Sequence, residues 1–286
     1  MKKLLVLVLA LAMIFAFAAC NSQQTPPVSA PPVEDEIQAD EDPVEEEVVD
    51  ETHEPVTLLV AAAASLENAF KELIPAFQAQ YDWITVEGAY DSSGKLQTQI
   101  EEGLAADIFV SAANKQMDAL VESAHINADS VVGLLENKVV LIESSAAPTG
   151  LTDFAEVIDF DGVVALGDPG SVPAGQYAEE IFTSLGVWDG VLAKASLGTN
   201  VTEVLNWVAA GSAGLGVVYA TDAASKTGEV AVIAEAPEGS LAAPVIYPLG
   251  ILAHTEQAEA TQLLYEFLQG PEASAIFESY GFTINK

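Results

Sequence analysis

Short apolar runs alternate with segments of helical periodicity from residue 56 to the end of the chain. Such alternation predicts an α/β fold built on mostly parallel sheets, with helices covering both faces. Strands are expected at residues 56–60, 84–88, 107–110, 139–142, 163–166, 215–219 and 230–233. Helices are expected at about 66–77, 96–102, 115–123, 174–185, 201–210, 260–268 and 271–280.

Two serines stand where an extended run gives way to an expected helix. Ser65 follows the apolar run that begins at residue 56, and Ser93 precedes the helix expected from residue 96. Ligands of α/β folds bind beyond the carboxyl ends of strands, at helix N-termini. A serine there either caps the helix with its side-chain oxygen or directs its hydroxyl and nearby N–H groups at a ligand. Taken singly, each serine is compatible with both roles.

Three further positions follow the same pattern of uncharged donors after a strand. Pro173 presets the first helical turn and leaves the N–H of Ala174 free to point outward. Asn200 is a good cap, which leaves the N–H of Val201 available. Tyr219 ends a strand, where its hydroxyl either reaches into a cleft or is satisfied within the core. These groups predict a site made of neutral hydrogen-bond donors.

The charge of the chain limits its partners. It has 43 acidic residues against 9 Lys and Arg, all of them lysine, and a formal net charge of −34. Nucleic-acid binding needs a basic footprint and is ruled out as a default, and the charge argues against docking on anionic lipid headgroups. The high charge suppresses self-association, so we expect a monomer. Without arginine, any bound anion must be held by dipoles and neutral donors, and an organic carboxylate is disfavoured.

The N-terminus resembles an export signal. Lys2 and Lys3 precede an uncharged apolar run over residues 4–19, which is short for a membrane span. The segment ending at Cys20 resembles a bacterial lipobox, so we expect a signal peptide over 1–19 and a lipid on Cys20. An ordinary secretory signal with an incidental cysteine is the alternative. Residues 20–55 are acidic and rich in proline, which predicts a disordered tether. The chain is therefore expected outside the cytoplasm, anchored to the cell membrane.

The remaining chain is expected to form two lobes. Lobe 1 comprises residues 56–138 together with 246–286, and lobe 2 comprises 139–245. The chain would cross between them twice, near Asn137 and Lys138 and again near residues 244–247. Two crossings make a hinge about which the lobes can close.

Seven motifs, in order, carry a resemblance over residues 56–284. They are Ala62-Ala-Ala-Ser65-Leu66, Ser92-Ser93, Ala106-Asp-Ile-Phe-Val-Ser111, Gly167-Asp-Pro169, Val172-Pro-Ala-Gly175-Gln-Tyr177-Ala178, Gly216-Val-Val-Tyr219 and Tyr280-Gly-Phe-Thr-Ile284. The set resembles the periplasmic molybdate-binding proteins of ABC transporters. That resemblance implies a type II two-lobe periplasmic-binding-protein fold and capture of molybdate or tungstate for a membrane permease.

The resemblance also implies residue roles. Ser65 and Ser93 would donate hydroxyl and N–H bonds, Ala174 and Val201 would donate backbone N–H bonds, and Tyr219 would donate its hydroxyl. It implies no cofactor, no direct metal-cation ligand and no catalysis.

Two alternatives stay open. The first is the same fold binding sulfate or another small anion. The second is an exported hydrolase that uses Ser65 or Ser93 as its nucleophile, although the sequence offers no evident base and no Gly-x-Ser-x-Gly elbow. His53, His125 and His254 are scattered and lack the spacing of metal ligands.

Overall fold

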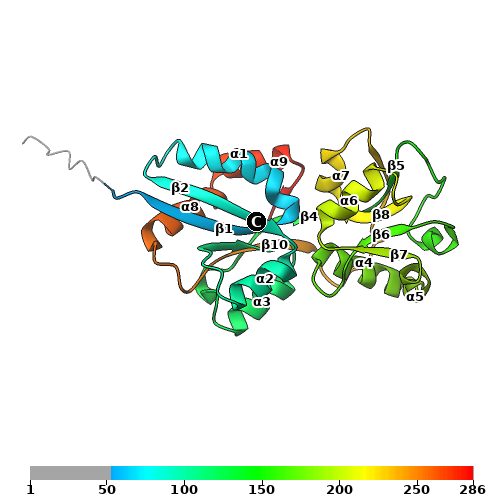
Figure 1. Ribbon diagram of the computed structural model, residues 1–286, viewed down its shortest axis with the longest axis horizontal. Helices are drawn as coiled ribbons and strands as arrows, with labels where there is room; N and C mark the ends of the chain where they lie inside the picture. The colour runs from blue at the N-terminus through cyan, green and yellow to red at the C-terminus, as the bar shows by residue number, and fades with distance from the viewer. Residues whose placement is uncertain (1–52, 286) are drawn as a thin grey trace, which may run out of the picture. The chain divides into compact units, whose positions relative to one another are not determined.

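The computed structural model describes residues 53–285 (Figure 1). The expected signal peptide, Cys20 and nearly all of the expected tether lie outside these residues. Within the described part of the chain, no helix is both long and apolar enough to span a bilayer.

Two sheets and the helices around them make up the described residues. The strands are β1 (Val56–Ala63), β2 (Ile84–Asp91), β3 (Ile108–Val110), β4 (Val132–Asn137), β5 (Val139–Ser144), β6 (Val164–Gly167), β7 (Ala195–Gly198), β8 (Leu215–Tyr219), β9 (Val230–Glu235), β10 (Val245–Ile251) and β11 (Thr283–Ile284). The α-helices are α1 (Glu67–Gln78), α2 (Ser93–Glu101), α3 (Asn114–Glu122), α4 (Pro173–Ser184), α5 (Trp188–Leu192), α6 (Val201–Ala209), α7 (Ala220–Ser225), α8 (Ala258–Gln269) and α9 (Pro271–Ser279). Short 3₁₀ helices are η1 (Ala64–Leu66), η2 (Ala128–Ser130) and η3 (Ala155–Asp159).

The first sheet has the strand order β11-β4-β10-β3-β1-β2. Strand β1 pairs in parallel with β2 and β3, whereas β10 runs antiparallel to β3 and β4. Helices α1 and α9 lie on one face of this sheet, and α2 and α3 lie on the other (Figure 1). In β1, Val60 and Ala61 belong to different buried clusters, because successive side chains of a strand face opposite sides. Burial on both faces explains the continuous apolar run at this strand.

The second sheet has the strand order β7-β6-β8-β5-β9. Its parallel part is β7-β6-β8, and β5 runs antiparallel to both β8 and β9. Helices α6 and α7 lie on one face, and α4 and α5 lie on the other (Figure 1). Both sheets are thus mixed. The carboxyl ends of their parallel strands lead into η1, α2, α3, α4, α6 and α7.

The chain passes from one sheet to the other at Lys138. Strand β4 ends at Asn137 in the first sheet, and β5 begins at Val139 in the second. The chain returns in β10, whose first residue, Val245, is the register partner of Asn137. Val245, expected in the second lobe, instead pairs within the first sheet. The α/β two-lobe fold class is confirmed.

Strands β4, β7, β10 and β11 were not expected from the sequence. Strand β10 contains Pro248, which lacks the N–H that a central strand normally contributes to the ladder. The register of β10 against β4 shifts between Tyr247 and Pro248, and this irregularity accommodates the proline between two neighbours.

Asp222 is a buried carboxylate in the first turn of α7. Only 6% of its surface is exposed, and it accepts a 3.1 Å hydrogen bond from the backbone N–H of Tyr219. Burial raises the pKa of Asp222 from 3.8 to about 7, and the hydrogen bond from Tyr219 opposes part of this rise. The native state therefore holds this proton more tightly than the unfolded chain does.

We predict that Asp222 makes the protein less stable as pH rises. Below pH 4 both states are protonated. Between about pH 4 and 7 only the unfolded state loses the proton, so the free energy of unfolding falls, by about 4 kcal/mol in total at higher pH. Asp222→Asn keeps an oxygen acceptor and removes the charge. Urea unfolding at pH 5 and pH 8 should show a much smaller loss in this variant than in the wild type.

The control is Asp153→Asn, an exposed aspartate that accepts a hydrogen bond from the N–H of Ala155. It should keep the wild-type pH dependence. Parallel pH profiles for the wild type and Asp222→Asn would contradict the assignment.

Candidate functional site

A small pocket lies where the ends of β1, β2 and β8 meet the starts of α2, α4 and α6. All five predicted site residues line it, together with six neighbours, of which five are apolar and one is a serine. The lining residues are Ala63, Ala64, Ser65, Ser92, Ser93, Ala112, Val172, Pro173, Ala174, Val201 and Tyr219. Its volume is about 10 Å³. Pockets for organic ligands are commonly about 300–1,000 Å³, so this one is far too small for an organic ligand.

The two serines do not cap helices. Ser65 lies in η1, directly after β1, and its Oγ is 3.0 Å from the hydroxyl of Tyr247. Ser93 is the first residue of α2, while the cap is Ser92, whose Oγ accepts from the N–H of Lys95. The buried Oγ of Ser93 accepts a 2.9 Å bond from the N–H of Ala112, which leaves its own proton to donate. The capping alternative is therefore wrong for Ser65 and Ser93.

Two helix starts face these serines from the second sheet. Helix α4 begins at Pro173, and α6 begins at Val201 after the cap Asn200, whose Oδ1 accepts from the N–H of Glu203 at 2.9 Å. Within residues 53–285, the N–H groups of Ala174 and Val201 donate to no protein acceptor. The first N–H groups of a helix have no intrahelical partner, and they carry the positive end of its dipole.

Glycines bring the start of α4 close to its strand. A Cβ added at Gly175 would collide with the carbonyl oxygen of Gly167 at the end of β6. Any other residue would push the first turn of α4, which carries the N–H of Ala174, away from the end of β6.

Tyr219 contributes a buried hydroxyl without a partner. Its residue is 1% exposed, and its Oη forms no hydrogen bond with any described residue. Burial, followed by the proximity of Tyr247 and Tyr177, raises its pKa well above 10, so the hydroxyl keeps its proton at neutral pH. An unpaired buried hydroxyl is costly and rare in native proteins, so in a pocket it is a candidate donor to a ligand.

Contacts between the two sides enclose this pocket. The backbone N–H of Gly94 donates to the carbonyl oxygen of Ser171 at 2.9 Å. The side-chain amide of Asn200 donates to Asp91 Oδ1 at 3.2 Å. The described arrangement therefore has its lobes in contact around the pocket.

Charged groups are absent from the residues that line the pocket. Lys95, the nearest lysine in the sequence to Ser93, pairs with Asp91 at 3.3 Å instead. Among residues 53–285, no group of three His, Cys, Asp or Glu side chains is placed to hold a metal ion. The pocket thus presents donors and no ionised side chain, which suits an anion that carries no proton.

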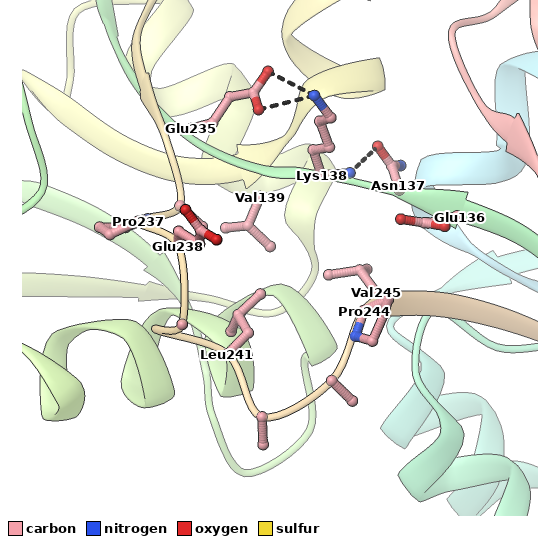
Figure 2. Close-up of a pocket in the computed structure, with 14 residues that line it drawn as sticks. Glu136, Asn137, Lys138, Val139, Glu235, Pro237, Glu238, Leu241, Pro244 and Val245 are labelled. Carbon is pink, nitrogen blue, oxygen red and sulfur yellow. Dashed lines mark hydrogen bonds and ion pairs between the residues drawn. The ribbon is translucent and has the colours of Figure 1, made fainter.

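A larger cavity of about 550 Å³ lies beside the crossing strands (Figure 2). Its polar groups are mostly engaged with one another. Lys138 Nζ contacts both carboxylate oxygens of Glu235, at 3.0 and 2.9 Å, and the N–H of Lys138 donates to Asn137 Oδ1. The small pocket, with its unpaired donors, is therefore the better candidate site.

Sequence reasoning missed Ser92, Ala112 and Tyr247. The sequence did not show which residue of the pair Ser92-Ser93 caps the helix, since either serine could do so. Tyr247 lies in β10, a strand that the sequence did not predict because Pro248 is unusual inside a central strand. No sequence signal marked Ala112, whose N–H meets Ser93 only through the fold.

Comparison with known proteins gives consistent results. The profile of the family described as "Bacterial extracellular solute-binding protein" matches residues 58–283. The chain is 37% identical over 233 residues to YvgL of Bacillus subtilis (strain 168), which is described as an ABC transporter substrate-binding lipoprotein. That alignment covers 82% of this chain and 88% of YvgL.

Molybdate-binding proteins are among the relatives. The chain is 36% identical over 233 residues to the molybdate-binding protein ModA of Escherichia coli (strain K12), covering 79% of this chain and 89% of ModA. The solved periplasmic molybdate-binding protein of Azotobacter vinelandii shares the fold, with a TM-score of 0.70 and 24% identity over 80% of this chain and all of that one. From the profile match and these alignments, the chain belongs to the bacterial extracellular solute-binding proteins.

Proposed function

We propose that this chain captures molybdate or tungstate between its two lobes and delivers it to an ABC importer in the membrane. The observation that carries the proposal is the convergence of unpaired neutral donors on one small pocket, with the partnerless hydroxyl of Tyr219 among them. Relatives named as molybdate-binding proteins support the choice of ion.

Neutral donors can supply the binding energy. The hydroxyl and N–H groups of Ser65 and Ser93, the N–H groups of Ala174 and Val201 and the hydroxyl of Tyr219 are seven donors. A hydrogen bond to a charged partner contributes about 1.5–3 kcal/mol, so the gross sum is about 10–20 kcal/mol. Ordering and lobe closure reduce this sum, and the remainder is compatible with micromolar or tighter binding.

A pocket of donors selects the protonation state of its ligand. A fully deprotonated tetrahedral dianion accepts a bond at every oxygen. A hydrogen phosphate ion carries an O–H for which the pocket offers no carboxylate acceptor, only hydroxyl oxygens that also serve as donors to the ion, so it should bind less well than the dianion. Sulfate satisfies the same donors, so sulfate or another small anion remains the alternative ligand, separated from molybdate by size.

Capture without chemistry is the better reading of the two serines. A nucleophilic serine needs a base within hydrogen-bond reach. The Oγ of Ser93 instead accepts from the N–H of Ala112, and Ser65 contacts the hydroxyl of Tyr247. None of the residues that line the pocket is His, Asp, Glu or Lys. We therefore propose a binding protein that is not an enzyme and needs no cofactor.

Export and anchoring complete the proposal. The signal peptide over 1–19, the lipid on Cys20 and the tether over 20–55 would hold a monomer at the outer face of the cell membrane, within reach of its permease. Residues 56–138 with 246–286 and residues 139–245 would move as two lobes about the crossings.

Closure brings the backbone of α2 against the loop before α4. The N–H of Gly94 donates to the carbonyl oxygen of Ser171, and a Cβ at Gly94 would collide with that oxygen. Glycine at this position therefore permits the closed state that surrounds the ion.

The first prediction from this function concerns the ligand. Calorimetry on the mature chain with Cys20→Ser should give micromolar or tighter binding of molybdate or tungstate, weaker binding of sulfate, and no measurable binding of phosphate at pH 7. Absence of binding and of thermal stabilisation by molybdate and tungstate would contradict the proposal. Tight binding of sulfate alone would support the alternative ligand.

The second concerns Tyr219→Phe, which should shift stability and affinity in opposite directions. Removing an unpaired buried hydroxyl should leave the unliganded protein as stable as before or up to about 1 kcal/mol more stable. Oxyanion binding should weaken by about 1.5–3 kcal/mol because one donor is lost. Urea unfolding and calorimetry measure the two effects.

Tyr265→Phe is the matched control, because the Tyr265 hydroxyl donates to the carbonyl oxygen of Ser130 at 2.8 Å, outside the pocket. It should lose stability and keep its affinity. A destabilised Tyr219→Phe protein with unchanged affinity would refute the role of the hydroxyl.

The third concerns Gly94→Ala. Alanine is the better helix former inside α2, so a state with the lobes apart should be as stable as before or up to about 1 kcal/mol more stable. The clash with Ser171 should cost about 1–3 kcal/mol in the closed state, weakening molybdate roughly 5- to 150-fold. Calorimetry measures the loss, and X-ray scattering should show less compaction with molybdate. Gln99→Ala, an exposed change on the same helix, should alter neither quantity.

A further inference from the structure

A buried polar cluster lies between the crossing strands and the pocket. Its members are Asn137, the last residue of β4, Tyr247 in β10 and Thr221 in α7, and each is less than 8% exposed. The side-chain amide of Asn137 donates to Thr221 Oγ1 at 2.9 Å and to the hydroxyl of Tyr247 at 3.3 Å. The hydroxyl of Tyr247 in turn lies 3.0 Å from Ser65 Oγ.

The orientation of the Asn137 amide is fixed by its neighbour. The backbone N–H of Lys138 donates to Asn137 Oδ1 at 2.8 Å, as Figure 2 shows. An N–H needs an acceptor, so the atom that faces Lys138 is the amide oxygen. The amide nitrogen therefore faces Thr221 and Tyr247, with one proton available for each.

This orientation favours one direction for the next bond. Either hydroxyl of the Ser65–Tyr247 contact can be the donor, but Tyr247 already accepts from Asn137, and donation to Ser65 Oγ is the direction that gives its single proton a hydrogen-bond acceptor. Burial, followed by the nearby Asp222, raises the pKa of Tyr247 well above 10, and the proton stays in place. Ser65 Oγ then accepts from Tyr247, and its own proton is left for the pocket that Ser65 lines.

We propose that Asn137 and Tyr247 are positioning residues that make Ser65 an obligate donor to the bound oxyanion. The inference rests on the proposed function and names what orients one of its donors. Thr221 belongs to α7, which packs against the second sheet, whereas Ser65 follows β1 of the first sheet. The chain of hydrogen bonds Thr221–Asn137–Tyr247–Ser65, called the relay below, therefore connects the second lobe to a donor of the first.

A double-mutant cycle separates orientation of Ser65 from a purely structural role of the Tyr247 hydroxyl in the buried cluster. Tyr247→Phe keeps the ring and removes the hydroxyl that orients Ser65. In calorimetry with molybdate it should weaken binding about fivefold, the effect of about one hydrogen bond. In a Ser65→Ala background the same change should weaken binding less than twofold, because the group that it orients is already gone. Equal losses in both backgrounds would overturn the proposal.

Asn137→Asp provides a second variant of nearly the same shape. The carboxylate has no proton to give, so the Tyr247 hydroxyl should donate to it and then accept from Ser65. The proton of Ser65 would leave the pocket. The loss of molybdate affinity should be at least threefold larger with Ser65 present than with Ser65→Ala, because charge repulsion acts in both backgrounds. Equal losses would again overturn the proposal.

Tyr265→Phe is the control for removal of a tyrosine hydroxyl, and it should leave affinity unchanged. The wild-type titration separates failure of the proposed function from failure of the relay. If the wild type binds sulfate in place of molybdate, the same double-mutant cycle is measured with sulfate, and its result supports or overturns the relay by the same criteria. If the wild type binds none of molybdate, tungstate, sulfate and phosphate, the proposed function and the relay both fail.

Discussion

An anion that is bound without any positive side chain must be surrounded by correctly directed dipoles. This constraint organises the molecule, because the chain has no arginine and the lysine next to the pocket is paired with Asp91. Each donor comes from the start of a helix or the end of a strand, where backbone groups lack partners for reasons of helix geometry. The fold thus directs the unpaired N–H groups of several helix N-termini at one point, where together they form a binding surface. Small residues around that point let the backbone approach closely.

The crossing strands serve two purposes at once. They carry the chain between sheets, and they bring Asn137 and Tyr247 into register beside the pocket. Aromatic rings extend this connection, since Tyr219 and Tyr247 pack edge to face at 5.6 Å, and Tyr247 packs in the same way on Phe282 at 5.5 Å. Tyr219 belongs to the second sheet and Tyr247 to the first, so hydrophobic packing is continuous through the point about which the lobes would turn.

Residue patterns predicted much of this arrangement. Apolar runs and helical periodicity indicated the class of fold and most elements, because burial on both faces leaves a continuous signal in the chain. Strand β10 escaped prediction because Pro248 is tolerated only through a shift of register, which pairing partners far along the chain decide. The five predicted residues line one pocket, yet the sequence could not say which serine caps α2 or what Ser65 contacts. Those facts depend on Ala112 and Tyr247, which approach only in the folded state.

The bond from Gly94 to Ser171 joins main chain to main chain across the pocket. Replacing the side chain of Ser171 leaves its carbonyl oxygen in place, and Gly94 has no side chain to replace. A comparison that scores only side-chain chemistry therefore does not detect this backbone hydrogen bond, and substitutions of the surrounding side chains leave its two backbone groups in place. The side chains around the ion can therefore change during evolution of ligand preference without breaking this bond. The bond itself requires only that position 94 stays glycine, because a methyl group there would collide with the carbonyl oxygen of Ser171.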